Sequence, residues 1–260
     1  MLNLKVILST FKLHLSQSFS RVTFRFCIIV QPLIYTFIFY MMYKDSSYAN
    51  YANYIILGSG LTSLWSSICF SSAGDIERER YMGTLENLVS SPSKFTTIVL
   101  GKVLANTLLG LTGMALSLIF TRVFFNGSLH IEHGFLFFIS FILMIFSFVC
   151  IALVIAPIFT LSKNARALMN CLEYPIFILC GFVFPITLLP RFIRPLSYIL
   201  SPTWTVKILR ESSLGIDNFS IFYREMFILF CISMVYLIIS KVLFSRIDKR
   251  TRIKATLGVS

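Results

Sequence analysis

Six long apolar runs, separated by short polar segments, organise the chain. A helix rises 1.5 Å per residue, so about 20 apolar residues are needed to cross the roughly 30 Å hydrocarbon layer of a bilayer. Each run is close to that length, and the pattern predicts an all-α integral membrane protein with one domain spanning residues 1–260. The predicted transmembrane helices are 26–43, 54–73, 97–120, 134–159, 167–184 and 226–244.

The segment ahead of the first run, residues 1–25, has a different pattern. Leu4, Leu8, Phe11 and Leu15 recur at helical spacing among basic residues. This predicts an amphipathic helix lying in the membrane interface. A cleavable signal peptide is not expected, because no apolar core ending in small residues precedes the first span.

Composition supports a membrane environment. Hydrophobic residues make up 57% of the chain and charged residues only 13%, with a mean hydropathy of +0.82; soluble domains average about 25% charged residues. The net charge of +12 would also suit a nucleic-acid-binding protein. However, Lys and Arg cluster beside the predicted spans, so we expect membrane lipids rather than nucleic acid as partners. The six cysteines lie in or beside apolar stretches without metal-ligand spacing, so no metal site is expected.

The distribution of basic residues predicts the orientation. With the N-terminus inside, 16 of the 23 Lys and Arg residues fall on the cytoplasmic side. By the positive-inside rule, both termini are cytoplasmic in a multi-pass protein of the inner (plasma) membrane.

A mixed-charge segment, E-R-E-R-Y-M-G-T-L-E-N-L-V-S-S-P, interrupts the apolar pattern between the second and third spans. Gly83 is expected to end a first short helix and Thr84 to cap a second one. Apolar residues beside charged ones suit docking into a groove on another protein. The alternative is a helix lying on lipid, but the acidic residues of this segment disfavour contact with an anionic membrane surface.

Two predicted spans carry polar residues, and each set has two possible roles. Small residues of the second span, Gly60, Ser63, Ser67 and Ser71, form one stripe that either packs against another helix or lines a substrate path. In the fifth span, Glu173 is an intramembrane carboxylate, which is costly unless it faces protein or water. It is either a gate or substrate contact or a structural carboxylate near the cytoplasmic end. The candidate translocation path therefore comprises Ser63, Ser67, Ser71, Asn170 and Glu173.

The segment 185–225 contains four of the eight prolines. It is apolar but too interrupted to span the membrane as one helix. We expect short re-entrant helices in the outer leaflet, buried against protein.

The string E-R-E-R-x-x-G-T-L-E-x-L-x-x-S-P after the second span resembles the signature of ABC type-2 transporter permeases, and G-F-x-F-P-x-x-x-L-P after the fifth is similar to that family too. The resemblance covers essentially the whole chain. It implies that region 75–92 contains a cytoplasmic coupling helix seated in a separate ABC ATPase subunit. Under this resemblance the docking residues are Glu77, Arg78, Glu79, Arg80, Gly83, Thr84, Leu85, Glu86 and Leu88.

The same resemblance implies a second permease subunit, either an identical copy or a sister chain. It also implies that the proline-rich segment closes the path on the outside, and the outer gate is then formed by Phe184, Pro185, Leu189 and Pro190. The chain contains no G-x-x-x-x-G-K-[ST] phosphate loop. We therefore expect no catalytic residues and no cofactor in this chain, with ATP and Mg²⁺ bound by the partner ATPase.

The function expected from these features is a permease subunit that exports an amphipathic drug, antimicrobial peptide or lipid. An alternative cargo is a lipid-linked glycan or polysaccharide. Other classes are a membrane-embedded lipid-modifying enzyme using Glu173, which would need a second acid or histidine nearby, and an ion-coupled carrier, which normally shows paired broken helices.

Overall fold

The computed structural model describes residues 2–44, 51–84, 93–162 and 164–254. Regular structure in these ranges is helical, as expected where hydrocarbon leaves no water for the backbone to bond. The elements are α1 Leu2–Ser20, α2 Val22–Tyr43, α3 Tyr51–Tyr81, α5 Phe95–Phe125, α6 Gly134–Leu161, α7 Ala165–Leu179, the 3-10 turn η1 Ile186–Leu188, α8 Arg194–Ile199, α9 Ser201–Leu214 and α10 Phe219–Lys254.

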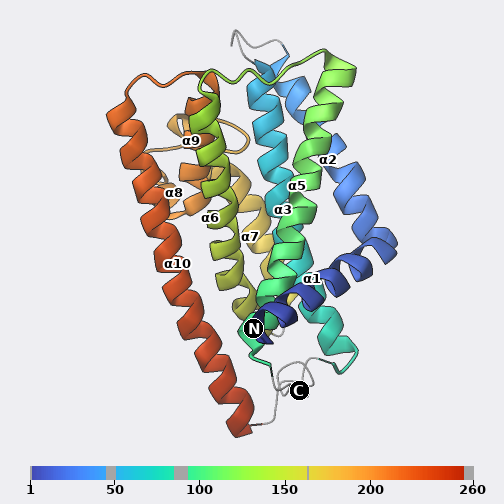
Figure 1. Ribbon diagram of the computed structural model, residues 1–260. Coiled ribbons are helices and arrows are strands. Elements are labelled where there is room, and N and C mark those ends of the chain that lie inside the picture. Colours follow the sequence, from blue (N-terminus) through green and yellow to red (C-terminus); the bar gives the residue numbers. More distant parts are fainter. Residues whose placement is uncertain (1, 45–50, 85–92, 163, 255–260) are drawn as a thin grey trace.

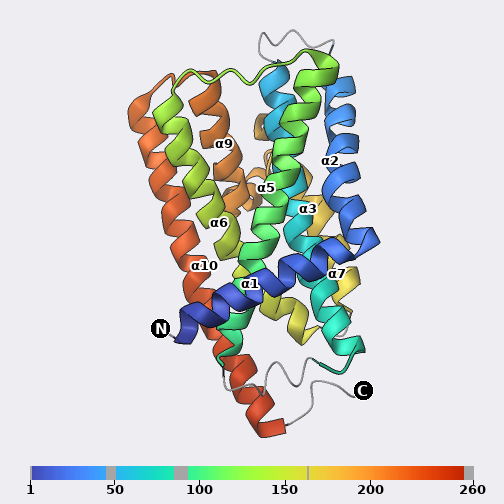
Figure 2. The same cartoon turned by 45° about the vertical axis from the view of Figure 1, so that its right-hand side comes forward.

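The long helices α2, α3, α5, α6 and α10 run side by side as one bundle (Figure 1). Helix α1 crosses this bundle steeply, over α5 (Figure 2). The last turns of α3 and α10 lie at the end of the bundle where α1 crosses, which we call the α1 end. The connections from α5 to α6 and from α9 to α10 lie at the opposite end.

Four of the described helices are long and apolar enough to cross a membrane, within Phe24–Tyr43, Phe95–Phe125, Gly134–Thr160 and Phe219–Ile247. They match the first, third, fourth and sixth predicted spans. Helix α3 is 31 residues long but carries more small and polar residues than these four. The chain is therefore an all-α, multi-pass membrane protein.

The fifth predicted span, 167–184, is shorter than expected. Helix α7 has 15 residues, about 22 Å of helix, and ends at Leu179. Gly181 follows with φ +75°, a left-handed conformation that turns the chain away from the helix axis. The short elements η1 and α8 come next, and α9 then packs against α6 and α10 nearer the opposite end (Figure 1).

Helix α3 forms the centre of the bundle. Its residues Leu57, Leu61 and Trp65 are fully buried, and it packs closely against α5. At Gly110 of α5 an added Cβ would lie 2.5 Å from Leu64 Cδ1 and 3.0 Å from Leu64 Cα. Only a residue without a side chain allows the two backbones to approach this closely.

Helix α1 differs from the predicted 1–25 helix. It ends at Ser20, and Arg21 adopts an extended conformation before α2 begins. The face buried against the bundle is polar, with His14 and Ser18 at 2% and 0% exposure, whereas Leu4 and Leu8 are exposed. The apolar residues of α1 are thus available to lipid, as expected for an interfacial helix.

Candidate functional site

The segment of mixed charge begins as the last turns of α3, because residues 75–81 continue that helix rather than forming a separate one. Gly83 has φ +67°, and the Thr84 N–H donates to the Glu79 carbonyl, which closes the helix end. Tyr81 and Met82 are exposed, at 94% and 57%. Two accessible apolar side chains thus lie where α3 ends.

Glu79 holds the end of α3 to α5. Its Oε1 accepts a hydrogen bond of 2.8 Å from Lys102 Nζ, and its Oε2 accepts one from the Thr84 hydroxyl. Burial alone would raise the pKa of Glu79, but the bonds from Lys102 and Thr84 outweigh it and leave that pKa lowered. The carboxylate is therefore ionised and paired at neutral pH.

Arg80 holds the same helix end to α6. Its guanidinium donates to the carbonyls of Thr160, at 2.9 Å, and Ser162, at 2.7 Å. These groups lie where α6 ends at Leu161, so they lack helical partners and carry the negative end of the helix dipole. A cation is well suited to this position.

The other predicted docking residues are described less fully. Arg78 is half-buried, whereas the side chain of Glu77 and the whole of Leu85, Glu86 and Leu88 lie outside the described residues. Their part in ATPase docking stays a prediction.

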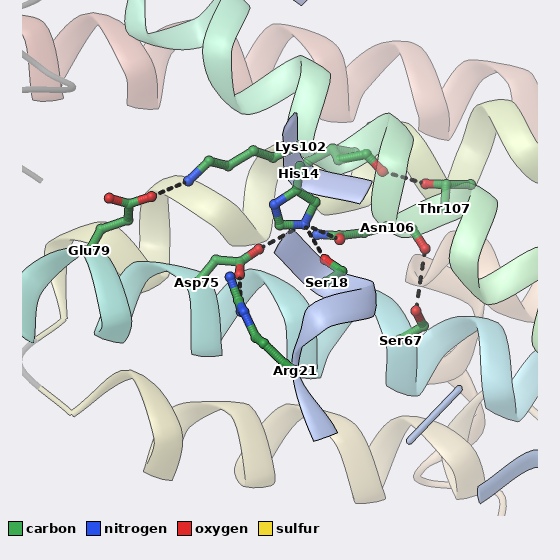
Figure 3. A network of polar contacts seen from close by, with 10 residues as sticks. His14, Ser18, Arg21, Ser67, Asp75, Glu79, Lys102, Asn106 and Thr107 are labelled. Carbon is green, nitrogen blue, oxygen red and sulfur yellow. Dashed lines mark hydrogen bonds and ion pairs between the residues drawn. The ribbon is translucent and has the colours of Figure 1, made fainter. Parts of the chain in front are cut away.

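A buried polar cluster lies beside this helix end, where α1, α3 and α5 meet (Figure 3). His14 Nε2 is 2.6 Å from Asn106 Oδ1 and 3.0 Å from Asp75 Oδ2. Arg21 Nη1 donates to Asp75 Oδ1 at 2.9 Å. We call His14, Arg21, Asp75 and Asn106 the α1 cluster.

The geometry of the α1 cluster defines the state of His14. Its Nε2 faces two oxygen acceptors, so this nitrogen carries a proton. Burial lowers the pKa of His14 despite the attraction of Asp75, so the imidazole is neutral at pH 7. The charged pair is then Arg21 with Asp75, and the cluster ties α1 to α3 one turn before Glu79.

Sequence reasoning missed the α1 cluster. His14 and Asn106 are 92 positions apart, and Arg21 and Asp75 are 54 apart. No spacing rule connects them; a histidine and a serine at positions 14 and 18, on one helix face, were the only local signal.

Glu173 lies in a second buried network. It is 4% exposed, and its Oε1 accepts a 2.5 Å hydrogen bond from Ser66 Oγ of α3. Ser66 is also 3.3 Å from the Tyr35 hydroxyl, which accepts from Gln31 of α2. The carboxylate therefore links α7, α3 and α2, and the three partners were not singled out from the sequence.

The remaining path candidates lie elsewhere. Ser63 Oγ donates to the Ser59 carbonyl of its own helix at 2.8 Å, and Ser67 Oγ donates to the Asn106 carbonyl at 3.3 Å. Both serines lie towards α5, where Ser63 comes close to Gly113. Asn170 is exposed although Glu173 is buried, and the Ser71 side chain lies outside the described residues. The structure thus places the small stripe in helix packing, and its role in a path stays a prediction.

The predicted outer-gate residues lie around η1. Phe184 and Pro185 are half-buried, Leu189 is buried and Pro190 is exposed. Arg194 Nε donates to the Leu189 carbonyl at 2.9 Å, and the Tyr43 hydroxyl donates to the Val183 carbonyl at 2.6 Å. Pro185 lines a cavity of about 340 Å³ together with residues of α9.

The family described as "ABC-2 family transporter protein" matches residues 42–241, which is most of the chain and includes Glu79, Arg80 and Glu173. This chain belongs to the ABC-2 transporter family. Its long apolar helices fit membership of a family of membrane transporter proteins.

Two relatives are both described as "Probable multidrug ABC transporter permease YbhS", from Escherichia coli K12 and O157:H7. Each is 29% identical over 194 residues, which cover 73% of this chain and 45% of the relative. The chain spans less than half the length of the curated relatives that it matches. Membrane subunits of the ABC-2 family are not in general enzymes themselves.

Proposed function

We propose that this chain is the permease subunit of an ATP-driven exporter and that a separate ATPase drives it through the segment after α3. The observation that carries the proposal is the anchoring of that segment. The string that resembles the family signature begins in the last turn of α3, and Glu79 and Arg80 tie this turn to α5 and α6.

This anchoring defines a route for force. An ATPase bound to residues 82–92 would displace the end of α3. The ion pair of Glu79 with Lys102 would carry the displacement to α5, and Arg80 would carry it to α6. Because α3 is the central helix of the bundle, its movement would change the packing of its neighbours.

We further propose six membrane crossings with the α1 end in the cytoplasm. Helix α3 would form the second crossing. Helix α7 together with the re-entrant residues 180–214 would form the fifth. The α1 end carries most of the basic residues, which supports this orientation for a protein of the inner membrane. A second permease subunit would complete the path.

An amphipathic cargo suits the polar groups inside the bundle. Glu173 with Ser66 and Tyr35 offers polar contacts within otherwise apolar helices. The name of the Escherichia coli relatives refers to multidrug transport, which agrees with an amphipathic substrate. ATP and Mg²⁺ would be bound by the ATPase subunit.

The test is to reconstitute the chain with its cognate ATPase in proteoliposomes and to compare Arg80→Ala with Arg224→Ala. Arg224 is an exposed arginine at the opposite end and serves as the matched control. Removing Arg80 deletes two hydrogen bonds from a charged group, each worth about 1.5–3 kcal/mol. We expect Arg80→Ala to keep ATP hydrolysis but to lower transport of a fluorescent amphipathic dye about tenfold or more.

Two results would contradict the proposal. Equal transport by the Arg80 and Arg224 variants would exclude the route through α6. Failure of the wild-type chain to bind or stimulate its cognate ATPase would exclude the exporter function itself.

A further inference from the structure

Arg210 of α9 is a buried cation without a counter-ion. It is 9% exposed, and its Nη2 donates to the Phe182 carbonyl at 3.0 Å. Its Nε is buried without an acceptor, and no carboxylate within the described ranges forms an ion pair with it. A buried charge of this kind is costly unless an opposite charge reaches it.

The position of Arg210 is set by an aromatic ring. Its Cζ lies 5.0 Å from the centre of the Tyr54 ring at the start of α3. This cation–π contact and the bond to Phe182 hold the guanidinium in place. The Nε–H is buried and has no acceptor in the described structure.

The two neighbouring acids, Glu211 and Glu225, both lie close to Lys207. Lys207 Nζ pairs with Glu225 of α10, and it lies 3.8 Å from Glu211 Oε1. Lys207 carries one positive charge and offsets one of these two glutamates. Neither glutamate forms an ion pair with Arg210 in the described part of the chain.

Arg210 lines the cavity of about 340 Å³ beside η1. The walls combine hydroxyls and aromatic rings with apolar side chains, as in sites that hold small amphipathic ligands. The walls include Tyr54, Thr187, Tyr198 and Thr203, together with the charged pair of Lys207 and Glu211. A ligand can therefore reach the guanidinium through a lining that suits both a polar head and an apolar tail.

We propose that this cavity binds the anionic head group of an amphipathic molecule and that Arg210 is its counter-ion. A phosphate or carboxylate would accept the unused guanidinium N–H groups, which suit such anions in a forked geometry. The molecule is either a bilayer lipid or a transported amphiphile. In the second case the inference rests on the proposed function and narrows the cargo to anionic amphiphiles.

The test uses the full chain alone in phosphatidylcholine nanodiscs, titrated with dodecyl phosphate. Trp204 reports binding, because its ring lies 5.5 Å from that of Tyr198 in the cavity wall. Trp65, the other tryptophan, is fully buried in α3 and gives a constant background. We expect dodecyl phosphate to change Trp204 fluorescence with saturation and dodecyltrimethylammonium not to do so.

Arg210→Gln is expected to raise the midpoint of the dodecyl phosphate titration about 10- to 100-fold, the effect of losing one charge-assisted hydrogen bond. Arg210→Lys keeps the positive charge but loses the paired N–H donors of the guanidinium. Its dodecyl phosphate midpoint should therefore lie between those of wild type and Arg210→Gln. Arg224→Gln removes an exposed charge from the same end and should bind as wild type does. If the buried Arg210→Gln variant fails to fold, the preference of the wild type for the anionic probe remains a complete test.

Equal responses to the anionic and cationic probes, or equal midpoints for Arg210→Gln and Arg224→Gln, would overturn the proposal. Repeating the dodecyl phosphate titration in phosphatidylglycerol nanodiscs distinguishes a bilayer lipid from a free amphiphile as the ligand. Either result agrees with an anion site. Loss of the dodecyl phosphate response assigns the cavity to bilayer lipid, and its retention assigns it to a free amphiphile. Because no ATPase is present, failure of binding would leave the proposed transport function intact.

Discussion

Three buried ionisable side chains show how single residues are accommodated in this apolar protein. Glu173 accepts a hydrogen bond from Ser66, and His14 lies between Asn106 and Asp75. Arg210 lies over the Tyr54 ring and donates a hydrogen bond to the Phe182 carbonyl, but no carboxylate among the described residues pairs with it. The first two sites are completed by the chain itself, whereas the third is completed only by a ligand.

At the residue scale, the α1 cluster predicts a pH dependence of stability. Burial lowers the pKa of His14 below the value of about 6.5 that it has in the unfolded chain. The unfolded chain then binds more protons below pH 6.5, so stability rises with pH through this window and is lost as the pH falls towards the lowered pKa. Arg21 and Lys102 disfavour protonation further, whereas Asp75 favours it.

We expect the thermal midpoint of the purified chain to fall between pH 7.5 and pH 5, and His14→Asn to reduce that fall. His130→Asn removes an exposed histidine at the opposite end and is the matched control. Identical pH profiles for wild type and His14→Asn would show that His14 is not the group responsible.

At the element scale, the close packing of α3 on α5 depends on positions without a side chain. Gly110→Ala would place a methyl group against the Leu64 backbone, and overpacking of this kind costs about 1–3 kcal/mol. The higher helix propensity of alanine recovers up to about 1 kcal/mol. We expect a net loss of about 1–2 kcal/mol, seen as a lower thermal midpoint.

Gly134→Ala is the matched control for this packing, because a Cβ at Gly134 meets no atom within 4 Å. It should leave the thermal midpoint unchanged or slightly raised. A Gly110→Ala chain as stable as the Gly134→Ala chain would mean that α3 and α5 are free to separate.

At the scale of the whole molecule, the two ends of the bundle differ in what they expose. The α1 end carries the exposed Tyr81 at the end of α3, and the opposite end carries the connection between α5 and α6. With the α1 end in the cytoplasm, a membrane-impermeant maleimide should label Ser128→Cys in intact cells. It should label Tyr81→Cys only after the membrane is permeabilised.

The wild-type chain is the control for this labelling, because two of its six cysteines, Cys171 and Cys231, are exposed and their background labelling must be subtracted. Labelling of Tyr81→Cys, but not Ser128→Cys, in intact cells would reverse the proposed orientation.

The sequence by itself determined the helical membrane class, four apolar spans and the place of the charged segment after α3. These features are local, because run length and charge can be read along one stretch of chain. The predicted 134–159 span, for example, lies within Gly134–Leu161. Local patterns were less informative for the fifth span, where Gly181 ends an apolar run that had no break in composition.

Only the tertiary structure decided which polar groups meet. Ser66 reaches Glu173 across 107 positions and His14 reaches Asn106 across 92, so neither pair leaves a trace in local spacing. Arg210 was counted from the sequence as one more charge outside the membrane, yet it is buried beside Tyr54. The physical reason is that burial depends on which helices pack together. Glu173 meets Ser66 where α7 packs on α3, and His14 meets Asn106 where α1 packs on α5.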